Sequence, residues 1–447
     1  MAETGSQPTV ESEHATASSA PRRWYQGVGR YQWLVLVIAS VGWIFDAYEG
    51  QIFNITRHDM LKQIVPHAGD PAFAKQNDFY GDALLGVFLA GGALGGVLFG
   101  MFADRWGRKP VMVATILFYS IFAGLTYFVA NVWQVAALRF LVAMGVGGEW
   151  AVAAALVAEV FPKHARAHAS GMFHASSCLG VWAAGLVGLA VAEKWRYAYL
   201  VSVVPALLVL WVWSSVKEPE TWVAARNHAA AGRGGKLGSL VALFADRLWG
   251  PRALLGTLLA AVGLGTFWAV SVAGQDLALD LLLKNGVSES DAAARAKFAY
   301  GVVEIIGWAA GMLCFGPLCV RLGRRGTFVL FQALSLVVVP LTCYAPSTYN
   351  QLLWLLPLYG FCTVGIHAGF AIYFPELFPN HLRSTGAGFC FNAGRLLAAV
   401  VLVFSGWLKS LPHMNLQLAI TLMNLLFVVG IGVVLLLPET KGQPLPE

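Results

Sequence analysis

Long apolar runs alternate with short polar segments along the whole chain. Each run has about the 20 residues that an α-helix needs to cross a bilayer. The pattern therefore predicts an all-α membrane protein with twelve transmembrane helices. The predicted spans lie near residues 31–53, 80–103, 111–130, 133–158, 167–191, 197–216, 253–273, 298–320, 327–345, 351–374, 385–409 and 415–437.

The composition supports this prediction and argues against a water-soluble protein. Of the 447 residues, 57% are hydrophobic and only 12% are charged, whereas soluble domains carry about 25% charged residues. The expected surroundings are therefore the lipid bilayer. The net charge of +6 does not indicate nucleic-acid binding, because the positive charges are concentrated in the loops on one side of the predicted membrane.

The distribution of Lys and Arg predicts the orientation of the chain. Of the 30 Lys and Arg residues, 19 lie in the tails and even-numbered loops, nine in the other loops and two inside spans. Cytoplasmic loops carry the excess of positive charge in membrane proteins. We therefore expect both termini in the cytoplasm, and the compact loops favour a bacterial inner (plasma) membrane.

The chain repeats itself at nearly one offset. Three motifs recur after 216, 217 and 219 residues: 105–109 as 321–325, 159–166 as 376–383, and 219–221 as 438–440. Such a repeat predicts two pseudo-symmetric six-helix bundles. The expected domains are a cytoplasmic tail 1–30, a bundle 31–216, a cytoplasmic linker 217–252, a second bundle 253–437 and a cytoplasmic tail 438–447. One position breaks the symmetry, because Val320 stands where the first repeat has Asp104.

Charged residues of both signs gather at the predicted cytoplasmic helix ends. Ion pairs there would hold the two bundles together while the inside is closed and would break when it opens. The alternative is that the cations only set the topology, but topology alone does not require the recurring carboxylates. The candidate gating network is Asp104, Arg105, Arg108, Glu159, Arg166, Glu220, Arg321, Arg324, Glu376, Arg383 and Glu439.

Charged residues inside the spans are candidates for proton coupling, because each costs at least about 2.5–3.5 kcal/mol in a bilayer. At a rise of about 1.5 Å per residue, Asp46 and Arg139 are expected about 8 and 9 Å from the outer face, so they could pair. Proton binding by Asp46 would then depend on its contact with Arg139. The alternative is a permanent structural ion pair. Glu49 shares the helix face of Asp46 and is a further candidate.

Arg395 is expected near the membrane midplane, where transporters of this architecture bind substrate. A lone guanidinium there favours an anion, because its forked donors match a carboxylate. The alternative is hydrogen bonding to neighbouring helices, with Asn392 nearby. Glu304 is a candidate second proton site or a partner for Arg395. His174 and His367 are intramembrane histidines, either substrate or proton-relay residues or ordinary core residues.

Several segments resemble the major facilitator superfamily. Segment 100–109 (GMFADRWGRK) resembles its signature loop between helices 2 and 3, and 139–149 (RFLVAMGVGGE) its helix 4 motif. Segments 147–150 (GGEW), 159–166 (EVFPKHAR) and 438–442 (PETKG) resemble the metabolite:proton symporters, which include aromatic-acid, sialate and monocarboxylate carriers. The resemblance implies symport of a small organic anion with protons by alternating access. The chain is expected to function as a monomer.

Three other functions remain open at this stage. A sugar or polyol transporter would use hydrogen-bonding side chains and a structural Arg395, a drug/proton antiporter would have a cavity tolerant of many apolar compounds, and a receptor would bind without accumulating its ligand. An enzyme is not expected, because the sequence shows no nucleophile triad, metal-ligand cluster or phosphate loop. No cofactor or metal is expected beyond the proton as coupling ion, and no nucleic acid as partner.

Overall fold

The computed structural model describes residues 23–65, 72–191, 194–233, 235–409, 411 and 413–446. Residues 1–22, most of the predicted N-terminal tail, lie outside this part. Every regular element in the described ranges is a helix. The first half of the chain contains α1 (Arg30–Ile64), α2 (Ala72–Trp106), α3 (Arg108–Leu125), η1 (Thr126–Phe128), α4 (Val132–Val160), α5 (Lys163–Ala175), α6 (Ser177–Val191), α7 (Arg196–Val201) and α8 (Pro205–Ser215).

The second half follows two short helices in the predicted linker, α9 (Glu220–Ala230) and α10 (Leu240–Ala245). Two π-helical turns interrupt it, η2 and η3. Such turns often occur at functional sites. The remaining elements are α11 (Trp249–Thr266), η2 (Phe267–Ser271), α12 (Gly274–Lys284), α13 (Glu289–Phe298), η3 (Ala299–Glu304), α14 (Ile305–Tyr344), α15 (Tyr349–Leu377), η4 (Asn380–Leu382), α16 (Arg383–Lys409), α17 (Leu416–Asn424) and α18 (Leu426–Leu436).

The prediction of twelve spans is confirmed once one long helical stretch is divided. Among the described residues, 11 stretches are long and apolar enough to cross a membrane, and one of them, Glu289–Tyr344, has 56 residues. A straight helix of that length would measure roughly 84 Å at a rise of about 1.5 Å per residue, far beyond a core of about 30 Å. Gly323 breaks the helix with a φ of 82°, so the stretch forms two spans.

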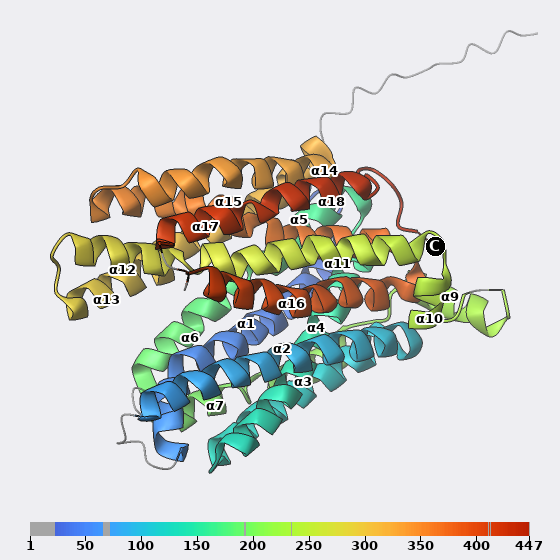
Figure 1. Cartoon of the computed structure of the whole chain (residues 1–447). Helices are drawn as coiled ribbons and strands as arrows, with labels where there is room; N and C mark the ends of the chain where they lie inside the picture. Colours follow the sequence, from blue (N-terminus) through green and yellow to red (C-terminus); the bar gives the residue numbers. More distant parts are fainter. Residues whose placement is uncertain are drawn as a thin grey trace, which may run out of the picture.

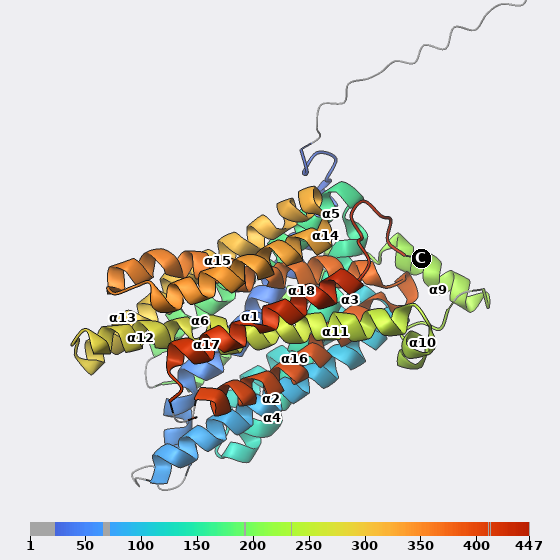
Figure 2. The same ribbon diagram turned by 45° about the horizontal axis from the view of Figure 1, so that its top comes forward.

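Two helical bundles lie side by side, one from each half of the chain (Figures 1 and 2). Helices α2 and α4 of the first half pack against α16, while α5 packs against α14 and α15. The linker helices α9 and α10 and the C-terminal segment lie together at one end of the molecule. The polar segments 104–109 and 320–325, which connect consecutive membrane spans and are called hinges below, lie at this end too. We therefore call it the hinge end. The domain boundaries named above stay a prediction.

Glycines permit the close helix contacts on which this packing depends. A Cβ atom at Gly95 of α2 would lie 2.0 Å from the Met144 carbonyl oxygen of α4. Across the two halves, a Cβ at Gly100 would lie 2.7 Å from the Ser384 carbonyl oxygen, and one at Gly316 would lie 2.5 Å from that of Ala167. The two contacts between the halves are therefore built in the same way by each repeat, with backbone against backbone.

Candidate functional site

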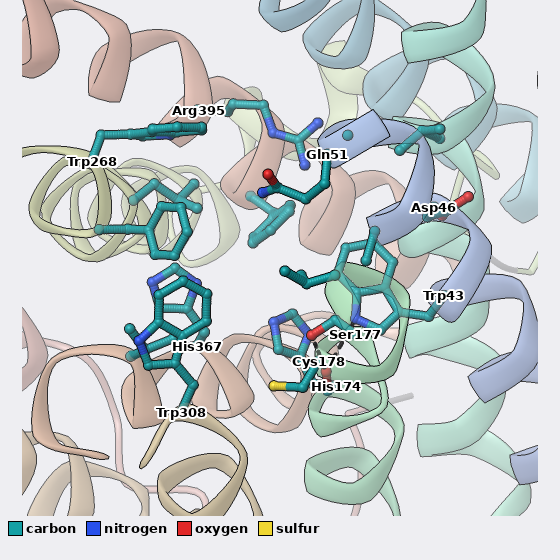
Figure 3. A pocket seen from close by; sticks show the side chains of 18 of the residues that line it. Trp43, Asp46, Gln51, His174, Ser177, Cys178, Trp268, Trp308, His367 and Arg395 are labelled. Atoms are coloured by element: carbon teal, nitrogen blue, oxygen red, sulfur yellow. Dashed lines mark hydrogen bonds between the residues drawn. The ribbon is translucent and has the colours of Figure 1, made fainter. Parts of the chain in front are cut away.

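A cavity of about 190 Å³ lies between the two halves. It is smaller than the roughly 300–1,000 Å³ of pockets that take drug-sized ligands. Its aromatic wall consists of Trp43, Phe88, Phe267, Trp268, Trp308 and Phe391. Its polar lining includes Asp46, Gln51, Asn54, His174, His367 and Arg395, several of which point into the central space in Figure 3. The lining therefore combines a large aromatic surface with a guanidinium, a carboxyl group and two imidazoles.

Arg395 extends from α16 into the cavity, with its guanidinium facing Gln51 of α1 (Figure 3). Its Cζ lies 5.2 Å from the centre of the Phe391 ring. Its Nη1 is buried and has no hydrogen-bond partner in the described part of the protein. Neighbouring helices therefore do not satisfy this atom, although it packs against Gly92 of α2, where a Cβ would lie 2.6 Å from it. A buried, unpartnered donor costs about 1–3 kcal/mol, and an incoming acceptor recovers that free energy.

Asn392 lies one turn closer to the hinge end and does not line the cavity, which corrects the prediction that it binds substrate. Its Nδ2 donates to the Gly388 carbonyl at 3.0 Å. The side chain fills the space beside Gly96 of α2, where a Cβ would lie 1.9 Å from Nδ2. Its role is therefore in the contact between α16 and α2.

The predicted pair of Asp46 and Arg139 does not form, and this prediction was wrong. The Arg139 guanidinium lies between the rings of Phe53 and Phe88, at 4.5 and 4.0 Å. Its Nη1 donates to the Glu49 carbonyl oxygen at 3.1 Å. The depth estimate was therefore right to about one helical turn, but rise alone does not fix the direction in which a side chain points.

Asp46 instead neighbours Glu149 of α4, a residue that the sequence analysis placed in a family motif but not in the site. Asp46 is 2% exposed and Glu149 is 1% exposed. The cation that interacts electrostatically with Asp46 is Arg395 of the opposite half. The one available signal was that Glu149 is an acidic residue inside a predicted span, which by itself marks a functional candidate.

Glu304 is fully buried on the π-helical turn η3. Its Oε1 accepts a hydrogen bond from Trp308 Nε1 at 3.1 Å, and Trp308 lines the cavity. Its Oε2 lies against Gly274, where a Cβ would come within 2.1 Å. No ion pair connects it to Arg395 within the ranges described, so the predicted alternative of a direct partner is wrong; its role as a proton site stays a prediction.

His174 and His367 face each other from opposite halves at the cavity wall, with ring centres 6.4 Å apart. His174 Nδ1 accepts from Trp150 Nε1 at 3.3 Å, and the His367 ring lies 3.2 Å from the Gly263 carbonyl oxygen. Each ring therefore has one fixed partner and one edge toward the cavity. Their part in substrate binding stays a prediction.

Most of the predicted gating residues meet at the hinge end. The Arg108 guanidinium pairs with Asp104 and Glu159, each at 2.7 Å. Glu159 also pairs with Arg383 of the second half at 2.9 Å, so an ion pair joins the two halves. In the second repeat, Arg324 pairs with Glu376 at 2.7 Å. These contacts are buried, where screening by solvent is weak.

Asp104 makes a second contact between the halves. Its carboxylate accepts the backbone N–H groups of Ser384 and Thr385, at 3.1 and 2.8 Å, and the Thr385 hydroxyl at 2.6 Å. It therefore caps the positive N-terminal end of α16. Val320, the equivalent residue of the second repeat, has no carboxylate to offer α5. The asymmetry expected from the sequence is thus present in the contacts.

Glu220 is exposed and forms no ion pair in the described part of the chain, which corrects its predicted place in the network. Glu218 takes that place: it accepts the backbone N–H groups of Arg108 and Lys109 at 2.8 and 2.9 Å. Glu439 does the same for Arg324 and Arg325, at 2.9 and 3.0 Å. In the structure Glu218 is therefore the equivalent of Glu439, whereas the recurring Pro-Glu-Thr motif aligns Glu439 with Glu220, two residues later.

Three other predicted members form no ion pairs within the described ranges. Arg105 Nε donates to the Leu237 carbonyl at 3.3 Å, and Arg166 Nε donates to the Ala158 carbonyl at 2.8 Å. Arg321 is exposed. These cations bind backbone or face outward, so the charge network is smaller than predicted.

Glu218 gives a pH-dependent prediction outside the spans. Burial raises the pKa of its carboxyl, against the opposing effect of the two backbone N–H groups. A carboxyl with a higher pKa in the folded state binds more protons folded than unfolded, so its contribution to stability increases as pH falls. We expect the unfolding temperature of the wild type to rise relative to that of Glu218→Gln as pH falls from neutral toward about 4.3, the ordinary pKa of Glu. Thermal unfolding in detergent measures this difference, Glu220→Gln is the matched control, and a difference that shrinks on acidification contradicts the prediction.

The comparisons with known proteins agree with this architecture. Residues 76–283 match the model of the Major Facilitator Superfamily. The chain is 27% identical to a putative metabolite transport protein of Haemophilus influenzae, over 94% of this chain and 99% of that protein. It is 28% identical to a probable 4-methylmuconolactone transporter of Cupriavidus pinatubonensis (94% and 93% covered) and 25% identical to the niacin transporter NiaP of Acinetobacter baylyi (94% and 96% covered). The solved structure of the proton:xylose symporter XylE superimposes with a TM-score of 0.72 over 93% of this chain and 98% of that one, at 16% identity, a likeness of fold.

Proposed function

We propose that this chain is a transporter of the major facilitator superfamily rather than an enzyme, and that it carries a small organic carboxylate together with protons. The observation that carries the proposal is the guanidinium of Arg395 in a largely aromatic cavity, because its buried Nη1 has no hydrogen-bond partner among the described residues. A carboxylate accepts two parallel hydrogen bonds from a guanidinium, while the rings hold the apolar body. The names of relatives support this class, since they include transporters of cis,cis-muconate, niacin and gentisate.

The contacts between the halves support alternating access. Asp104 and the Glu159–Arg383 pair close the hinge end, which we assign to the cytoplasmic side from the distribution of Lys and Arg. The cavity would then be loaded from outside. Breaking these contacts would open the inside, and a network that forms in only one state biases the equilibrium toward it.

Buried carboxyl groups supply the proton sites of the proposal. Asp46 lines the cavity and interacts electrostatically with Arg395. An anion bound to Arg395 would compete with Asp46 for the same cation, so proton binding at Asp46 would be linked to substrate binding. Arg139, Glu49 and Glu304 are also buried and remain candidates for the proton path.

Uptake into proteoliposomes tests this function. Labelled benzoate, cis,cis-muconate, nicotinate, sialate, lactate and xylose would each be offered with and without an inward proton gradient. Accumulation of at least one acid only with the gradient is the expected result. Accumulation of xylose alone would favour the sugar transporter, expulsion of acid against the gradient would favour an antiporter, and binding without uptake would favour a receptor.

A further inference from the structure

Two acidic side chains from different helices meet beside the cavity. Asp46 of α1 and Glu149 of α4 are almost fully buried. None of their four carboxyl oxygens has a hydrogen-bond partner in the part of the chain that the structure describes. The oxygens of an ionised carboxylate only accept hydrogen bonds. The two carboxyl groups can therefore form a hydrogen bond with each other only if one of them carries a proton.

Gly42 is the reason that Glu149 reaches this position. A Cβ at Gly42 would lie 1.8 Å from Glu149 Oε1, so the carboxyl group fills the notch that the glycine leaves on α1. Gly42 precedes Asp46 by one helical turn and therefore lies on the same face of α1. The notch thus places the Glu149 carboxyl next to that of Asp46.

The charges around this pair do not balance. Burying an uncompensated charge is costly, and two adjoining carboxylates do not both ionise in such a place. The three carboxyls Asp46, Glu49 and Glu149 face two guanidinium groups, so one carboxyl has no counter-charge. The titratable and charged groups that interact with the pair are Glu49, Tyr119 and Arg395. Arg139 interacts with Glu49, and His174 and Cys178 line the same cavity as Asp46.

We propose that Asp46 and Glu149 form a carboxyl dyad that shares the coupling proton, and that Arg395 governs its release. This inference rests on the proposed function. The dyad belongs to the first half and Arg395 to the second, so the rocking of the halves changes their separation. A substrate carboxylate on Arg395 neutralises its charge, and the dyad keeps its proton. When the anion leaves, the positive charge of Arg395 is free again and favours the deprotonated form of the dyad, so the dyad releases its proton.

Glu149→Gln is the first test, with benzoate, or whichever acid the wild type accumulates in the uptake panel, as the probe. In the wild type, proton and anion each increase the affinity for the other, so benzoate binds more tightly as pH falls through the neutral range. In Glu149→Gln, Asp46 stays ionised with or without a bound anion, because the new amide donates a hydrogen bond to it in place of the shared proton. We expect benzoate exchange between the two sides to continue, while gradient-driven accumulation and the pH dependence of affinity are lost. A variant that accumulates benzoate as the wild type does, with the same pH dependence, overturns the dyad.

Gly42→Ala tests the geometry while both acids stay in the chain. Its methyl group displaces the Glu149 carboxyl from Asp46, so accumulation should fall as in Glu149→Gln while exchange continues. Gly185→Ala is the matched control, a helical glycine of the same half with no atom within 4 Å of the added Cβ. If Gly42→Ala accumulates substrate as well as Gly185→Ala does, the neighbouring arrangement is not needed and the proposal fails.

Infrared spectroscopy tests the shared proton without any substrate. At neutral pH the purified wild type should show a carboxylic-acid C=O band that Glu149→Gln loses, because the remaining Asp46 is ionised. A band of unchanged intensity in Glu149→Gln overturns the dyad. This measurement separates the two proposals: if no acid of the panel is transported but the band is lost, the dyad stands and the proposed function fails.

Discussion

Replacing Arg395 by methionine is expected to lower gradient-driven carboxylate uptake about 30-fold or more. Truncating one member of a buried, hydrogen-bonded charge pair costs about 2–5 kcal/mol, and each 1.4 kcal/mol is about a factor of ten in affinity. Methionine keeps the length and apolar contacts of the side chain beside Phe391 but removes all five donors. Initial rates and half-saturation concentrations of benzoate or muconate uptake measure the effect.

Arg395→Lys separates charge from shape in the same assay. Lysine keeps a positive charge but cannot offer the two parallel donors of a guanidinium. We expect uptake between that of the wild type and of Arg395→Met, with most of the loss in half-saturation concentration. Wild-type uptake by Arg395→Met would show that the substrate does not bind this residue. That result would favour a sugar or polyol transporter, in which Arg395 is structural.

Removing the carboxylate of Asp104 is expected to shift the protein toward the state that is open at the hinge end, by about two- to 30-fold. Loss of an N-cap costs roughly 0.5–2 kcal/mol, and here the cap also joins the halves through Ser384 and Thr385. Arg108 keeps Glu159 as its partner, so the variant is not left with an unpaired buried cation. Net uptake should fall, because the return to the outward-open state becomes unfavourable.

Distances between spin labels at the exposed positions Lys163 and Leu322 would report this shift in Asp104→Ala. The labelled protein needs a background in which the exposed Cys314 is replaced by serine. The repeat offers a matched control: Val320→Ala changes the equivalent position of the second half, which caps nothing, and should leave the distance distribution unchanged. Equal shifts in both variants, or none in Asp104→Ala, would contradict the assignment of Asp104 as a lock between the halves.

The spans and their repeat were predictable because they depend on signals that are local in sequence. Each span is a continuous apolar run, and the recurring hinges mark equivalent helix ends in the two bundles. Even the merged stretch Glu289–Tyr344 was divided correctly, because the charged segment 321–325 cannot lie in hydrocarbon. The missing carboxylate at Val320 was visible in the same way, by aligning one repeat with the other.

The contacts within the site were harder to predict, because they depend on the direction of each side chain around its helix. Arg139 was placed at nearly the right depth and paired with the wrong residue. Glu149 was missed because its partner position depends on the notch at Gly42, 107 residues earlier in the chain. Glu218 was missed because the short Pro-Glu-Thr motif suggested a register that differs by two residues from the one the backbone adopts.

Helix α16 carries both the contact at the hinge end and the guanidinium in the cavity. Its first residues are held by Asp104 and Glu159, and Arg395 stands 12 residues further on, roughly 18 Å away at a rise of about 1.5 Å per residue. The helix of 27 residues contains no proline, so it acts as a stiff lever. A tilt that frees its first turn from α2 must also move Arg395 relative to α1. The same movement of one helix would therefore open the contact at the hinge end and change the binding site.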